Sequence, residues 1–124
     1  MEINAITHEI IGSSIDVHTV FGPGMLESAY ETCVAYELGR RGLFVETQVV
    51  LPLVYKGITI DAGYRLDLRV EQKVVVEIKA VETVHAVHKA QLLCYMRLSG
   101  CRVGLIINFN ERRLVDGITR MILD

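Results

Sequence analysis

Long apolar segments are missing from this sequence. Although 51% of its 124 residues are hydrophobic and the mean hydropathy is +0.34, no apolar run approaches the ~20 residues that a membrane-spanning helix needs. The amino-terminal residues Met1-Glu2-Ile3-Asn4 also lack the basic region and apolar stretch of an export signal. We therefore expect a soluble, cytoplasmic protein without a membrane partner.

Cysteines are few and do not suit a disulfide framework. Their number is odd and no pair has CxxC spacing, since they are Cys33, Cys94 and Cys101. Each lies in an apolar helix-like or strand-like context, which favours buried, reduced thiols over disulfides.

The sequence also lacks the positive charge of a protein that coats nucleic acid. Its net charge is −2 and its pI is near 6.1, which excludes binding by bulk electrostatics. No repeat, no glycine-rich phosphate loop and no Ser-His-Asp or Cys-His arrangement is present. Local phosphate contacts stay open at three basic sites, although an ordinary solvated helix end or loop is the favoured explanation of each: Arg40-Arg41, Lys89 with Arg97, and Arg112-Arg113.

The hydrophobic spacing predicts helices first, then strands, then a helix and further strands. We expect helices at 4–20, 25–41 and 84–99, ended by Phe21-Gly22-Pro23-Gly24, Gly42 and Gly100, and strands within 44–53, 54–60, 64–70, 74–79 and 102–109. A hairpin turn is predicted at Tyr55-Lys56-Gly57-Ile58, and the tail 114–123 is ambiguous, with a strand favoured. This order predicts a single α/β domain over residues 1–124, with a central mixed sheet flanked by helices.

Asp67, Glu77 and Lys79 are the most informative residues, because they lie in two strand-like runs joined by the short polar turn 71–73. A tight hairpin folded about Gln72 pairs positions whose numbers sum to about 144, so Asp67 lies opposite Glu77. Lys79 follows two residues later, on the same face as Glu77. The alternation predicts one apolar face on each strand, formed by Leu66, Leu68 and Val70 on the first and by Val74, Val76 and Ile78 on the second.

Two carboxylates directly opposite each other on a sheet repel, at a cost of up to ~1 kcal/mol. A divalent cation between them removes this cost, since Mg²⁺ is held by one or two carboxylates with water and phosphate oxygens. Lys79 can then orient or deprotonate the attacking water and offset charge on the phosphorus. The alternative for each charge alone is a solvated strand face, but the three in register favour a site.

Several short motifs together resemble the GxxExxY family. They are Gly24-Met25-Leu26-Glu27-Ser28-Ala29-Tyr30, Tyr64-Arg65-Leu66-Asp67, Glu77-Ile78-Lys79, His88-Lys89-Ala90-Gln91-Leu92 and Leu105-Ile106-Ile107-Asn108-Phe109. That family looks like a branch of the PD-(D/E)xK nuclease-like superfamily, which implies a restriction-endonuclease-like core of helix, three antiparallel strands, helix and strand. One departure is plain, because Arg65-Leu66 stands where the superfamily motif has its proline.

The resemblance implies a role for five residues. Asp67 and Glu77 would be metal ligands and Lys79 the catalytic lysine, while Glu27 would reach the same metal directly or through water and Gln91 would line the catalytic site. The implied cofactor is Mg²⁺, with Mn²⁺ as a substitute. The implied activity is that of a metal-dependent nuclease, with DNA favoured over RNA as the substrate.

Other interpretations of these helices stay open. Glu27, Tyr30 and Glu31 share one helix face, and an acid such as Glu27 near a helix amino terminus is also explained by the helix dipole. Gln91, Tyr95 and His88 share another face, which could be a buried polar cluster instead. A zinc site at His85 and His88 is disfavoured, since Cys94 lies too far along the helix. The alternative to an enzyme is a non-catalytic binding or assembly module with the same fold, such as a homodimer.

Overall fold

The computed structural model describes all of residues 1–124. The elements occur in the predicted order, and the ambiguous tail forms a short 3-10 helix followed by a strand. None of the helices is long and apolar enough to span a membrane. The elements are α1 (Ile3–Phe21), α2 (Glu27–Arg40), β1 (Val45–Val50), β2 (Leu53–Tyr55), β3 (Ile58–Ile60), β4 (Arg65–Val70), β5 (Val74–Lys79), α3 (Ala86–Ser99), β6 (Val103–Asn108), η1 (Leu114–Gly117) and β7 (Ile118–Ile122).

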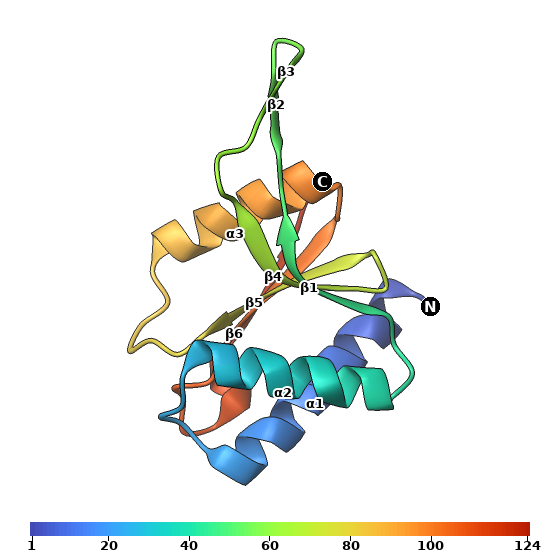
Figure 1. The fold of residues 1–124 in the computed structure, drawn as a ribbon. Coiled ribbons are helices and arrows are strands. Elements are labelled where there is room, and N and C mark those ends of the chain that lie inside the picture. Colours follow the sequence, from blue (N-terminus) through green and yellow to red (C-terminus); the bar gives the residue numbers. More distant parts are fainter.

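Five strands form a central mixed sheet in the order β1-β4-β5-β6-β7. Neighbouring strands are antiparallel except β5 and β6, which are parallel and are connected through α3. Helices α1 and α2 lie together on one side of the sheet and α3 lies on the other (Figure 1). The predicted α/β architecture, a central mixed sheet flanked by helices, is therefore confirmed.

The two sides of the sheet bury separate apolar clusters. Leu68, Val70 and the predicted face of β5 pack with α1 and α2, whereas Val75 packs with Leu92 and Met96 of α3. One prediction is wrong here, because Leu66 belongs to the α3 cluster and not to the face that carries Leu68. The pairing between β1 and β4 is interrupted between these two leucines, so the regular alternation of a strand does not carry across that position.

Strands β2 and β3 form a separate two-stranded arm that projects from the body of the protein (Figure 1). The predicted turn is confirmed, since Lys56 and Gly57 both have positive φ, 49° and 79°, as a tight two-residue hairpin requires. The arm exposes Val54, Tyr55 and Ile58 to solvent.

All three cysteines are free, as predicted. Cys101 is buried, but Cys33 and Cys94 are partly exposed, so the expected burial is wrong for these two thiols. Both lie on helices whose outward sides are open to solvent.

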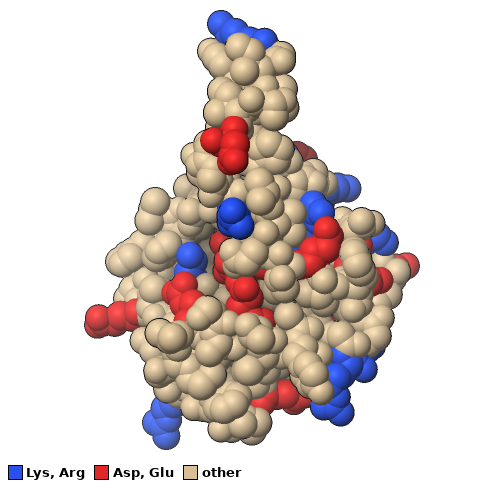
Figure 2. All heavy atoms as spheres, viewed as in Figure 1, with Lys and Arg blue, Asp and Glu red and all other residues tan.

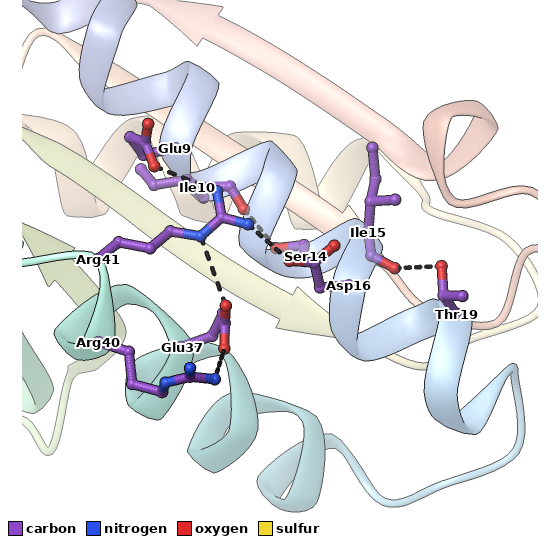
Figure 3. Close-up of polar contacts among 9 residues, drawn as sticks. All are labelled: Glu9, Ile10, Ser14, Ile15, Asp16, Thr19, Glu37, Arg40 and Arg41. Carbon is purple, nitrogen blue, oxygen red and sulfur yellow. Dashed lines mark hydrogen bonds and ion pairs between the residues drawn. The ribbon is translucent and has the colours of Figure 1, made fainter.

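Arg41 joins the carboxyl end of α2 to α1 through acidic side chains (Figure 3). Its guanidinium lies 3.1 Å from Glu9, 2.6 Å from Asp16 and 3.6 Å from Glu37. Gly12 makes room for this contact, since a Cβ there would lie 2.7 Å from Arg41 Nη1. This commitment of Arg41 to the helix pair argues against its use as a phosphate contact.

We expect Arg41→Met to destabilise the protein by about 1 kcal/mol, because a partly exposed ion-pair network is worth little more than this. Urea unfolding at low and high salt measures the effect, and the loss should shrink as salt screens the wild-type network. Arg112→Met is the control, since Arg112 is exposed and has no ion pair. Equal effects of the two substitutions would show that the network contributes nothing.

Candidate active site

The β4–β5 hairpin has the predicted register. Leu68 pairs with Val76 and Val70 with Val74, and the turn is made by Glu71 and Gln72 with φ values of 52° and 56°. Asp67 and Glu77 are the next residues outward along the two strands, so they face each other where the regular pairing stops.

At this point the two carboxylates replace the missing backbone pairing. The Asp67 backbone N–H donates to Glu77 Oε2 at 2.8 Å, and the Ile78 N–H donates to Asp67 Oδ2 at 2.8 Å. The strands are thus held together by reciprocal bonds from side chain to backbone. Each acid has one oxygen that accepts a backbone amide. The second oxygen of Glu77 has no hydrogen-bond partner within the protein, whereas that of Asp67 lies 3.4 Å from Gln48 Nε2 and keeps lone pairs for a further partner.

Burial and repulsion act strongly on Glu77, which is only 5% exposed. Burial, followed by the negative charge of Asp67, raises the pKa of Glu77 to about 8, although the Asp67 N–H and the charge of Lys79 oppose the shift. Burial also raises the pKa of Asp67, against the Ile78 N–H and Lys79. The ionised pair is therefore disfavoured unless a further positive charge joins it.

Lys79 is at the end of β5 and is partly buried. Its charge favours ionisation of both Asp67 and Glu77, yet it forms no salt bridge with either. The ammonium group therefore acts on the acids through space and is free to bind another anion.

Glu27 is the first residue of α2, and the loop that precedes this helix brings it to the same end of the sheet. Tyr30 is fully buried and stacks on Phe109 with ring centroids 4.3 Å apart, while its hydroxyl donates to Gly22 O and accepts from the Met25 N–H. Gly24 has a φ of 110°, which a residue with a side chain rarely adopts. The Gly24-to-Tyr30 motif thus shapes the loop, and Glu27 Oε2 accepts the Ala80 N–H at 2.9 Å, directly after Lys79.

Glu31 and Gln48 also belong to the site, although sequence reasoning assigned them no role in it. Gln48 Nε2 donates to Glu31 Oε1 at 2.7 Å and lies 3.4 Å from Asp67 Oδ1. Burial and the charge of Asp67 raise the pKa of Glu31 to about 7, against the Gln48 hydrogen bond. The shared helix face of Glu27 and Glu31 was the available signal, whereas nothing in the sequence marked Gln48.

Tyr95 is the residue of α3 that lies buried near the two acids, whereas Gln91 of the same helix is exposed. Tyr95 is 5% exposed, and burial with the charges of Glu77 and Asp67 raises its pKa. The ring of Tyr64 packs edge-on against it at 6.2 Å. Gln91 is exposed and its side chain makes no hydrogen bond within the protein, so the alternative of a buried polar cluster is wrong for this residue.

Below the base of the β2–β3 arm, the visible face of the protein shows a group of acidic side chains with basic side chains nearby (Figure 2). No group of three or more His, Cys, Asp or Glu side chains is arranged to hold a metal ion by protein ligands alone. Mg²⁺ does not require one, because one or two carboxylates with water and substrate oxygens suffice. The oxygen donors and excess negative charge of Asp67 and Glu77 therefore fit a hard divalent cation.

His85 is the N-cap residue of α3, and His88 lies in the first turn of that helix. His88 Nδ1 accepts the His85 N–H at 3.0 Å, which satisfies a backbone donor at the amino terminus of α3.

Comparison with known families gives one match. A family model described as the PD-(D/E)XK nuclease superfamily matches residues 4–121. Neither the curated proteins nor the solved structures contain a significant match to the chain. The matched range includes α2, α3, all but the first residue of α1, and the strands β1, β4 and β5 that carry the site.

Proposed function

Because this chain belongs to the PD-(D/E)XK nuclease superfamily, we propose that it is a Mg²⁺-dependent nuclease that hydrolyses phosphodiester bonds of DNA. Nucleic acid is the substrate class that this family implies. DNA in preference to RNA, Mg²⁺ as the natural ion with Mn²⁺ as a substitute, and membership of the GxxExxY branch are parts of the proposal.

The reciprocal bonding of Asp67 and Glu77 is the observation that carries it. The amides of Asp67 and Ile78 fix one oxygen of each acid, and Lys79 follows on the same strand without an ion-pair partner. A stability-driven sequence would not bury two facing acids beside an unpaired lysine. The free-energy cost of burying these acids beside an unpaired lysine is explained if the acids bind a cation and the lysine binds a phosphate.

In the proposed mechanism Asp67 and Glu77 would hold the divalent cation, and Glu27 would reach it directly or through water. When bound, that cation supplies positive charge that polarises the phosphate and acidifies water. Lys79 binds a phosphate oxygen, orients the attacking water and stabilises the charge that develops on phosphorus. Gln91, on the exposed side of α3, contacts the substrate backbone.

Cleavage of end-labelled nucleic acids by the purified protein tests the proposal. Single- and double-stranded DNA and RNA are incubated with Mg²⁺, Mn²⁺ or EDTA, and the products are resolved by length. We expect cleavage of DNA in Mg²⁺ or Mn²⁺ and none in EDTA. If the folded protein binds Mn²⁺ or nucleic acid but cuts none of the four substrates, the non-catalytic module is the better description.

A homodimer also stays a proposal. A domain of 124 residues offers little surface to a long nucleic acid, and a second copy would extend it. Light scattering coupled to gel filtration measures the assembly directly, with twice the monomer mass expected.

A further inference from the structure

Gln48 has a backbone conformation that is unusual for a residue inside a strand. Its φ is 50° in the middle of β1, in the left-handed region where a side chain with a Cβ is strained. Three other residues that are not glycine have positive φ, and all of them lie in the tight turns at 56 and 71–72. Gln48 therefore adopts its strained conformation without a turn to explain it.

The strain coincides with the gap in the sheet beside Asp67. Strands β1 and β4 pair at Thr47–Leu68 and at Val49–Leu66, but the intervening pair of Gln48 and Asp67 is skipped. The interruption frees the Gln48 side chain to turn toward the acids. Its amide then donates to Glu31 Oε1 at 2.7 Å and approaches Asp67 Oδ1 at 3.4 Å.

We propose that Gln48 is a positioning residue that orients Asp67 for cation binding and holds Glu31 beside it. This inference rests on the proposed function and adds a residue that no motif of the family resemblance contains. The Ile78 N–H fixes only one oxygen of Asp67, so the carboxylate can still turn about that bond. The Gln48 amide restrains the other oxygen and bridges two acids that otherwise repel each other.

The geometry also explains why a strained residue occupies this place. A residue with ordinary strand φ and ψ would continue the ladder with β4 and direct its side chain perpendicular to the sheet. The left-handed conformation instead breaks the ladder at one pair, without changing the register of the flanking pairs, and re-aims one side chain toward the site.

Two substitutions at Gln48 separate the effect of its side-chain amide from the effect of its backbone strain. Gln48→Met keeps the length of the side chain and the strained backbone but removes the amide, whereas Gln48→Gly removes the amide and relieves the strain. Gln72→Met and Gln72→Gly are matched controls, because Gln72 has a φ of 56° in the exposed β4–β5 turn. Calorimetric titration with Mn²⁺ measures cation affinity without substrate, and thermal unfolding in EDTA measures stability.

Both Gln48 variants should raise the Mn²⁺ dissociation constant by about ten- to a hundredfold, the usual effect of losing a residue that orients a metal ligand. Gln48→Gly should do so without a loss of stability in EDTA. The Gln72 pair should leave Mn²⁺ affinity unchanged. A crystal structure of Gln48→Met should show Glu31 turned away from Asp67, a readout that does not depend on a metal.

Failure of this inference can be told apart from failure of the proposed function. If the wild-type protein binds Mn²⁺ and cuts DNA while both Gln48 variants bind Mn²⁺ equally well, Gln48 has no positioning role although the nuclease proposal stands. If affinity falls only in step with thermal stability, the role is structural and the inference is wrong. If the wild-type protein neither binds Mn²⁺ nor cleaves, both proposals fall together.

Discussion

Asp67→Asn should reduce metal-dependent DNA cleavage by about a thousandfold, which corresponds to ~4 kcal/mol of lost transition-state stabilisation. The substitution removes the negative charge that faces Glu77 while keeping an oxygen that can accept the Ile78 N–H. The fold should survive, because the lost charge is one that burial already disfavours. Initial rates on labelled DNA in Mg²⁺ and in Mn²⁺, with circular dichroism of the variant, measure both effects.

Lys79→Met extends the same test to the third residue of the site. It keeps the length of the side chain and removes the ammonium group, so we expect a loss of about a hundred- to a thousandfold in cleavage rate. Lys56→Met at the tip of the β2–β3 arm is the matched control for Lys79→Met. Glu2→Gln at the exposed amino terminus is the matched control for the substitution Glu77→Gln. Residual cleavage equal to that of the wild-type preparation would identify the activity as a contaminant.

Glu77→Gln should abolish cleavage and yet make the metal-free protein more stable at pH 8, by about 2–4 kcal/mol. A glutamine oxygen can still accept the Asp67 N–H, and the neutral amide avoids the cost of a buried charge beside Asp67. Urea unfolding in EDTA at several pH values from 5 to 8 measures the difference.

The direction follows from the pKa of Glu77, which is raised from an ordinary 4.5 in the unfolded chain to about 8 in the folded protein. The folded state binds the proton more tightly, so this stabilising effect is fully present below pH 4.5 and is lost as pH rises through about 8. The advantage of Glu77→Gln should thus be largest at pH 8 and nearly absent at pH 5. A wild-type protein that gained stability over this range relative to the variant would contradict the account.

The hairpin that carries the site was predictable because its signals are local. A polar turn of fixed length joins two runs of alternating residues, so the register that places Asp67 opposite Glu77 follows from the turn. The buried strand β6 was equally predictable, since all of its residues are apolar or small until Asn108. These features depend on neighbours in the sequence.

Tertiary contacts decided what the sequence did not show. Leu66 changes sides because β1 and β4 skip a pair at Gln48, and no local pattern predicts a left-handed glutamine within a strand. Glu27 and Glu31 share a helix face, but their partners become visible only once α2 is packed against the sheet. Gln48 then lies between Glu31 and Asp67, and Glu27 accepts the Ala80 N–H. The metal-binding and catalytic roles of all five candidate residues stay predictions, namely those of Glu27, Asp67, Glu77, Lys79 and Gln91.

A crystal soaked in Mn²⁺ and measured at a wavelength with anomalous signal tests the central claim most directly. We expect one strong peak at the point where the regular pairing of β4 and β5 stops, within ~2.2 Å of carboxylate oxygens of both Asp67 and Glu77. A peak bound elsewhere, or none at these two residues at millimolar Mn²⁺, would contradict a metal-dependent nuclease site at this hairpin.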